Sequence, residues 1–177
     1  MSALPRRPRL TLVQGQAEEA PATWSWFCGH CAAPSPGGEA PFPTARVCQS
    51  CGLGLLLETP ADAVPSSRDA FLVIDASLLV QAMSRTAESL LAVTEDLAIN
   101  RSVTELLVAA DAEGRSESRF AGAVAQAAGA NQAPTHIYVR PWNTFGVRMR
   151  VRIAPCGPPR AALLVLEQSA RLRSLDR

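Results

Sequence analysis

Four cysteines near the start of the chain constrain its fold more than any other feature. Cys28 and Cys31 form one Cys-x2-Cys pair, sixteen residues follow, and Cys48 and Cys51 form a second pair. Each pair can wrap a tight turn around one side of a metal ion, and four thiolates complete a closed tetrahedral shell. This spacing predicts one structural zinc ion held by the four cysteines.

A redox site is the alternative interpretation of the first pair. A tryptophan-rich approach to Cys-Gly-His-Cys is also how the redox site of disulfide isomerases begins. That chemistry needs the first cysteine at the start of a helix, which lowers its thiol pKa. The residues that follow, AAPSPGGEAPFP, contain too many prolines and glycines for a helix. We therefore favour zinc, and expect His30 to be a solvated residue of the turn and not a ligand.

The segment from Trp24 to Glu58 resembles a zinc ribbon, because it carries two such cysteine turns. Ala32 stands where a glycine often follows the first pair. A stretch of about 35 residues buries too little apolar surface to fold alone, so metal binding is expected to supply much of its folding free energy. Gly52 and Gly54 are expected to adopt positive φ angles beside the second pair.

The charges and aromatic residues of this segment indicate what the ribbon could contact. Arg46 is its one basic residue, against Glu39 and Glu58, which leaves little to neutralise phosphates. Three aromatic residues favour docking on protein, or simply packing on the neighbouring domain: Trp24, Trp26 and Phe27.

Regular patterns begin at Ala70. Strands are expected at 71–75 and 79–84, helices at 85–93, 102–110 and 119–128, and strands at 135–140, 145–154 and 160–168. Ser102 stands three residues before Glu105, which is a capping-box pattern for the second helix. The last strand, AALLVLE, is apolar on both faces and is expected to be central or covered.

The long strand at 145–154 alternates between an apolar and a basic face. In the strand before it, His136 takes the polar phase together with two residues of the predicted interface. The interface is expected to comprise Tyr138, Arg140, Arg148, Arg150 and Arg152. The alternative is a solvated face whose long side chains cover the sheet.

Two strands, short helices and three antiparallel strands, in that order, resemble a PAS domain over residues 69–168. FLVIDASLLVQAMSRTAESLLA carries the resemblance, with Asp75 ending the first strand and Ala87 and Glu88 in the helix. Ser84 and Ala92 depart from the asparagine and glycine frequent at these positions. The resemblance implies an α+β fold, with a five-stranded antiparallel PAS-like sheet and helices on one face, joined to the small N-terminal ribbon.

Members of that family commonly act as sensory or protein-interaction modules, some with flavin, haem or a metabolite between sheet and helices. The helical region here has no cysteine for a flavin adduct and no histidine for haem. A core filled by apolar side chains is therefore expected. Cys156 is placed in the PCGPP turn as an incidental thiol.

The expected organisation is a tail at 1–22, the zinc ribbon at 23–58, a linker at 59–68, the PAS-like domain at 69–170 and a second tail at 171–177. No apolar run approaches the roughly 18 residues that span a bilayer, and the N-terminus lacks the apolar stretch of a secretory signal. We therefore expect a cytoplasmic protein without a membrane segment. Its thiols would stay reduced there.

These features predict a signalling or transcription-regulatory protein, in which a PAS-like domain senses a ligand or binds a partner and the ribbon docks another macromolecule. A homodimer or a complex with a protein partner is expected. A nucleic-acid-binding zinc-ribbon protein is the alternative, although a net charge of +1 is not a broad basic field. A thiol oxidoreductase is less favoured. No enzyme is expected, because phosphate-loop, serine-nucleophile and histidine-carboxylate patterns are missing.

Overall fold

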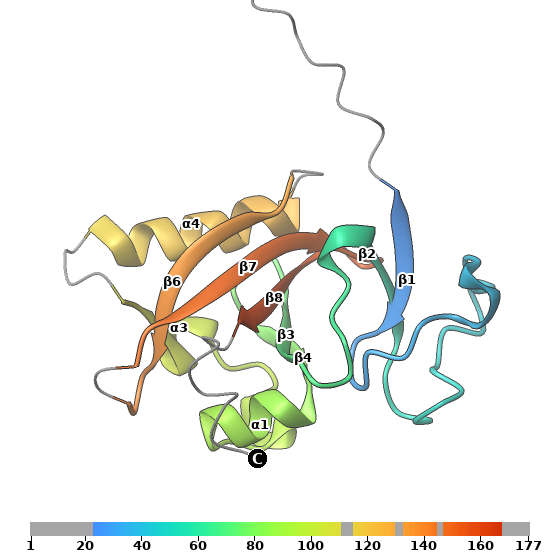
Figure 1. Cartoon of the computed structure of the whole chain (residues 1–177), viewed down its shortest axis with the longest axis horizontal. Coiled ribbons are helices and arrows are strands. Elements are labelled where there is room, and N and C mark those ends of the chain that lie inside the picture. The colour runs from blue at the N-terminus through green and yellow to red at the C-terminus, as the bar shows by residue number, and fades with distance from the viewer. Residues whose placement is uncertain (1–22, 111–114, 130–132, 145–146, 168–177) are drawn as a thin grey trace, which may run out of the picture.

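The computed structural model describes residues 23–110, 115–129, 133–144 and 147–167 (Figure 1). The strands are β1 Trp24–Cys28, β2 Leu56–Pro60, β3 Ala70–Ile74, β4 Val80–Met83, β5 Leu107–Ala109, β6 Thr135–Pro141, β7 Met149–Cys156 and β8 Ala161–Glu167. The helices are α1 Arg85–Leu91, α2 Glu95–Ala98, α3 Val103–Leu106 and α4 Arg115–Gly129, with short 3-10 turns at Pro36–Gly38 and Ala61–Ala63. Among the described helices, none has the length and apolar character needed to cross a membrane.

Two sheets organise the chain. Six strands form an antiparallel sheet in the order β4-β3-β8-β7-β6-β5, and β1 pairs with β2 in a separate hairpin. The predicted α+β class with an antiparallel sheet is confirmed, and the element order is the PAS-like order expected from the sequence. The sheet has one strand more than expected, because β5 adds to the edge at β6.

The helices cover one face of this sheet, which we call the inner face. Inward side chains of β3, β7 and β8 pack in one apolar cluster with buried residues of α1, α2, α3 and α4. Leu72, Ile153 and Leu164 are almost completely buried within it. Burying a side chain of this kind contributes about 2 kcal/mol, so this cluster is the main source of stability.

The opposite, outer face is also apolar where it follows β3 and β8. Phe71, Leu163 and Val165 point to this face and are buried there. β8 lies between β3 and β7 and is covered on both sides, as its doubly apolar sequence predicted.

The helix predicted at 102–110 is wrong in its second half. Only the turn of α3 is helical, after which Leu107 pairs with Pro141 as part of β5. Pairing with an existing sheet edge, together with burial of Leu107, outweighs local helix propensity. The capping box is also not formed, because Ser102 Oγ accepts from the Thr104 amide and Glu105 is bound by Arg101.

Two further positions differ from the expectation. β7 ends at Cys156, not at residue 154, so this cysteine lies at the end of a strand and not in the turn. Its side chain is buried on the outer face. The segment 59–68, expected as a linker, starts with the last two residues of β2, and the Thr59 hydroxyl donates to the Pro155 carbonyl at 2.8 Å. The domain boundaries stay a prediction.

Both departures from the PAS sequence pattern lie at the ends of α1. Ser84 is the N-cap, where its hydroxyl accepts from the Ala87 amide at 3.2 Å and from the Phe71 amide at 3.0 Å. Ala92 is the C-cap in the left-handed conformation, with φ of 52° and ψ of 42°. Glycine is common at such positions because a Cβ is disfavoured there.

Replacing Ala92 tests whether its left-handed conformation at the end of α1 is strained. Ala92→Gly should raise the free energy of unfolding by about 1 kcal/mol, because the left-handed strain is removed at an exposed site. Ala125→Gly in the exposed middle of α4 is the matched control and should lower stability by about 1 kcal/mol. Urea denaturation measures both, and equal destabilisation by the two substitutions would contradict the prediction.

Candidate metal centre and the adjoining cavity

The four cysteine sulfurs of the predicted set lie together. All four Sγ atoms are within 4.8 Å of one another, and the Sγ–Sγ distances are 3.7 Å for Cys28–Cys51 and 3.8 Å for Cys31–Cys48. A tetrahedral ion with metal–sulfur bonds of about 2.3 Å places its sulfurs about 3.8 Å apart. A disulfide would require about 2.05 Å. The sulfurs are therefore spaced as ligands of one metal ion, which fits this donor set.

Local backbone geometry presents these sulfurs to the centre. The amides of His30 and Cys31 point to Cys28 Sγ, and the Gly54 amide points to Cys51 Sγ, each at 3.4 Å. Such contacts stabilise thiolates, which are the form that binds metal. The two turns are alike, because the residue after the second cysteine of each pair is left-handed: Ala32 with φ of 60° and Gly52 with φ of 69°.

Gly54 has a role that the sequence did not indicate. It was expected to need a positive φ, but no such angle occurs there. Close packing is the reason for glycine, since an added Cβ would lie 2.4 Å from Cys28 Sγ and 2.7 Å from His30 Cβ. The backbone of Gly54 thus closes directly over the sulfur cluster.

The thiols differ in their acid–base properties. Burial raises the pKa of Cys28 and, to a smaller extent, that of Cys31 above their ordinary values. Burial also acts on Cys51, but the Gly54 and Leu53 amides and the neighbouring thiols outweigh it and lower its pKa to about 6. A cation at the centre would offset the cost of four thiolates in so small a volume.

His30 is not a solvated residue, contrary to the expectation. Its Nδ1 lies 3.1 Å from Glu95 Oε2, and its side chain is 13% exposed. The other oxygen of Glu95 accepts from the Met83 amide at 2.9 Å, and the Glu95 amide donates to Glu88 Oε1 at 2.7 Å. The first cysteine turn is therefore tied to the junction of β4, α1 and α2.

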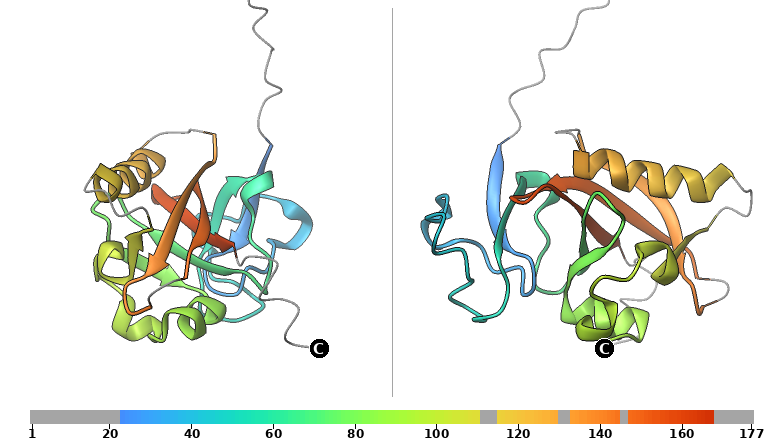
Figure 2. Two further views of the ribbon diagram at one scale, coloured as in Figure 1. Left: turned by 60° about the vertical axis from the view of Figure 1, so that its left-hand side comes forward. Right: turned by 180° about the vertical axis from the view of Figure 1, so that it is seen from behind.

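The cysteine module, residues 23–60, packs against the outer face of the sheet. Phe27 is completely buried and meets Phe71 edge to face, with ring centroids 6.2 Å apart. Arg46 adds a polar contact by donating to the Pro158 carbonyl between β7 and β8, and it donates to the Leu56 carbonyl within the module. Figures 1 and 2 show β1 at the end of the sheet remote from α3. The aromatic residues were expected either to dock on protein or to pack on the neighbouring domain. Phe27 packs on the neighbouring domain.

Cys156 lies at this contact, outside the four-sulfur set. It is buried in the same apolar cluster as Phe27 and Phe71, and burial raises its pKa to about 12. A thiol in this environment is a small apolar side chain and not a nucleophile.

The rest of the outer face carries the predicted arginine row. Arg148 stacks over Tyr138, with its guanidinium carbon 4.1 Å from the ring centre. Arg150 and Arg152 approach Glu167 at 3.5 and 3.8 Å. Arg152 also donates to the Asp62 carbonyl, so it forms part of the contact with the segment that follows β2.

Arg140 is the last arginine of the row, and it contacts the backbone beyond β6. Its side chain reaches the Thr144 carbonyl at 3.5 Å, beyond the end of β6. His136 also faces the polar side, 3.8 Å from Glu167. The structure thus gathers the predicted residues on one face, while their role as an interface stays a prediction.

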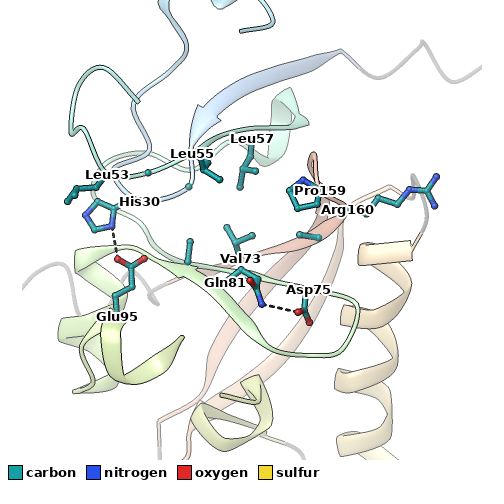
Figure 3. A pocket seen from close by; sticks show the side chains of 14 residues that line it. His30, Leu53, Leu55, Leu57, Val73, Asp75, Gln81, Glu95, Pro159 and Arg160 are labelled. Carbon is teal, nitrogen blue, oxygen red and sulfur yellow. Dashed lines mark hydrogen bonds and ion pairs between the residues drawn. The ribbon is translucent and has the colours of Figure 1, made fainter. Parts of the chain in front are cut away.

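A cavity of about 420 Å³ separates the cysteine module from part of the outer face. The module contributes His30, Leu53, Gly54, Leu55 and Leu57, and the larger domain contributes Val73, Asp75, Gln81, Ala82, Glu95 and Ala161. Figure 3 shows the leucines on one side and Val73 with Gln81 on the other, the His30–Glu95 pair closing one end. Sequence patterns could not reveal this cavity, because it is formed by segments far apart in the chain.

Comparison with known proteins gives matches at the level of structure alone. No protein-family description matches the chain. No curated protein matches it either.

Among the solved structures that overlap with part of the chain are the following three. The PAS domain of nitrogen regulation protein NR(II) from Vibrio parahaemolyticus is 15% identical, with a TM-score of 0.43, over 57% of this chain and 89% of that one. The photoactive yellow protein domain from the sensor histidine kinase Ppr of Rhodospirillum centenum is 16% identical, with a TM-score of 0.40, over 57% and 85%. The E. coli DhaR(N)–DhaL complex is 15% identical, with a TM-score of 0.39, over 58% of this chain and 32% of that one.

The tight packing at Gly54 yields a prediction about metal binding. Gly54→Ala should abolish stoichiometric metal binding, because the new methyl group would occupy the position beside Cys28 Sγ. Gly122→Ala in α4, where an added Cβ meets nothing within 4 Å, should retain the metal. Elemental analysis of both purified proteins gives the metal content, and a full complement of metal in Gly54→Ala would show that the turn is looser than described.

Proposed function

We propose that this chain is a non-enzymatic regulatory protein, in which one structural zinc ion folds the cysteine module against a PAS-like sensory or protein-interaction domain. The observation that carries the proposal is the tetrahedral spacing of four sulfurs from two like turns. Tetrahedral four-sulfur sites are typical of zinc or iron–sulfur centres, and zinc fits a single-ion, redox-inert structural role.

A structural role for the metal is supported by the donor count. Four cysteine ligands close the shell and leave no position for a substrate or an activated water. The module that the metal would fold covers apolar residues of the sheet, above all Phe71 and Val73. Zinc would therefore stabilise the larger domain as well as the module. A reducing compartment such as the cytoplasm would keep the thiols available for metal.

Zinc content and its effect on folding are directly measurable. Native mass spectrometry of freshly purified protein should give one zinc per chain and none in Cys48→Ser. Chelation of the wild type should lower the midpoint of urea unfolding and expose the indoles of the module to solvent, seen as a red shift in tryptophan fluorescence. Protein that contains no zinc, or that unfolds identically with and without chelator, would refute the proposal.

The arginine row supplies the second element of the proposed function. Four arginines lie in this region, and the carboxylate of Glu167 approaches two of them, Arg150 and Arg152. Tyr138 is 44% exposed and held in place under Arg148. Tyrosine and arginine are enriched at the centres of protein interfaces. We propose that this surface binds an acidic protein surface, either in a second copy of the chain or in a different partner.

Exchange of two arginines tests the surface without disturbing the module. Arg148→Ser with Arg150→Ser should weaken association at least tenfold, since charged hot-spot residues commonly contribute 2 kcal/mol or more. Arg152 is left in place because it contacts the Asp62 carbonyl. Arg68→Ser, exposed in the segment before β3, is the control.

Analytical ultracentrifugation and partner capture give the outcome of that exchange. Unchanged self-association together with unchanged partner capture would contradict the interface. Retention on DNA that falls steeply with salt and is lost in the double variant would instead support the nucleic-acid alternative.

A further inference from the structure

The cavity between the cysteine module and the sheet has the size of a small-molecule site. Its volume of about 420 Å³ falls within the roughly 300 to 1,000 Å³ typical of ligand pockets. It lies on the outer face of the sheet, whereas the helices and the main apolar cluster lie on the inner face. The site is therefore separate from the space between sheet and helices.

Its walls are mostly apolar and partly uncovered. Leu53 is 71% exposed and Leu55 is 49% exposed, although both line the cavity opposite the sheet. Val73 and Ala82 form the facing wall (Figure 3). An apolar body of modest size would fill the space between these walls and remove the leucines from water.

Two carboxylates, Asp75 and Glu95, line the cavity together with the polar side chains of His30, Gln81 and Arg160. Asp75 Oδ1 accepts from the amides of Ser77 and Leu79 at 2.8 and 2.9 Å, and Asp75 Oδ2 accepts from Gln81 Nε2 at 2.9 Å. These three donors are neutral, so they orient the carboxylate without neutralising it. Arg160 lies at the edge of the cavity, and its side chain extends away from Asp75 in Figure 3.

We infer that this cavity binds a small organic cation: an apolar amine whose hydrocarbon or aromatic body lies between the leucines and Val73, and whose ammonium group binds Asp75. A charged hydrogen bond to an oriented carboxylate is stronger than a neutral one, which sets the preference for a cation. An anion of the same shape would meet the charge of Asp75 and should bind more weakly, while Glu95 is already paired with His30. The inference deepens the sensory part of the proposed function by naming a ligand class and its site.

Metal and ligand are expected to bind cooperatively. Gly29, His30 and Gly54 line the cavity and also belong to the two cysteine turns. A folded, metal-bound module therefore forms one wall of the site. By linkage, a ligand that needs this wall must bind more weakly after the metal is removed, and must itself raise metal affinity by the same factor.

A matched series of indole compounds tests the ligand class. Tryptamine, 3-ethylindole and indole-3-propionate share one ring and differ in the charge of the side chain. Two-dimensional NMR titration of the intact zinc-loaded protein should show tryptamine binding most tightly, 3-ethylindole more weakly and indole-3-propionate weakest. Amide shifts should centre on residues that line the cavity: Leu53, Gly54, Leu55, Leu57, Val73, Asp75, Gln81 and Ala82.

Two substitutions locate the site. Asp75→Asn retains the Oδ1 acceptor for the turn amides but removes the charge, and should weaken tryptamine binding about tenfold while leaving 3-ethylindole unchanged. Ala82→Phe should fill the cavity and abolish binding of all three compounds, with the zinc content intact. Asp62→Asn, an exposed carboxylate outside the cavity, should change nothing.

The outcomes separate this inference from the proposed function. Equal affinity for tryptamine and indole-3-propionate, an unchanged affinity in Asp75→Asn, or no shifts at the cavity with any compound would each overturn the ligand assignment. Zinc stoichiometry and the arginine-dependent association are measured independently, so they would stand if the cavity binds no amine. Conversely, tryptamine binding that is unaffected by chelation would overturn the proposed coupling between metal and ligand.

Discussion

The packing of the cysteine module on the outer face of the sheet is the contact on which the rest of the structure depends. Each side of this contact lacks something that the other provides. The sheet presents Phe71, Leu163 and Val165 on the face opposite the described helices. The module has one completely buried large apolar side chain in this contact, Phe27, and too few residues for a core of its own. The proposed metal and the docking would therefore stabilise the module together.

This mutual dependence also explains why the outer face is divided. Along β3, along β8 as far as Val165 and at the end of β7, the outward residues are apolar and pack with the module. Along β6 and the first half of β7 they are tyrosine, histidine and arginine. Arg152 stands at the boundary, since it contacts both Glu167 on the sheet and the Asp62 carbonyl that follows β2. One part of the face is thus covered within the chain, and the proposed interface lies on the other part.

Local patterns in the sequence predicted much of this arrangement. The cysteine set was predictable because each half of the site is made by four consecutive residues. Alternation along β7 placed its arginines on one face, and the doubly apolar sequence of β8 predicted a covered strand. The sequence of β8 could not indicate which segment covers the strand, because an apolar run carries no information about its partner. The helix expected at 102–110 was wrong for a related reason: Leu107 is directed into β5 by a strand that lies about 30 residues later in the chain.

The contacts that sequence reasoning missed are those that connect the two parts. His30 and Glu95 are 65 residues apart, and neither belongs to a periodic pattern that marks a contact. Gly54 looked like a turn residue, yet its role is to let the backbone approach Cys28 Sγ. Such positions depend on how the module meets the sheet, which is a property of the folded chain.

Glu95 connects the first cysteine turn to β4 and to the helices α1 and α2. One of its oxygens binds His30 in the first cysteine turn, and the other binds the Met83 amide at the end of β4. Its own amide binds Glu88, so the same residue also joins α1 to α2. A change in the position of the cysteine turn must break or move at least one of these hydrogen bonds, at a cost of about 1 kcal/mol or more for each. The position of the first cysteine turn is thereby energetically linked to α1 and α2 on the inner side of the sheet, through contacts that do not pass through the apolar core. Occupancy of the proposed metal site would act on the helices by this route.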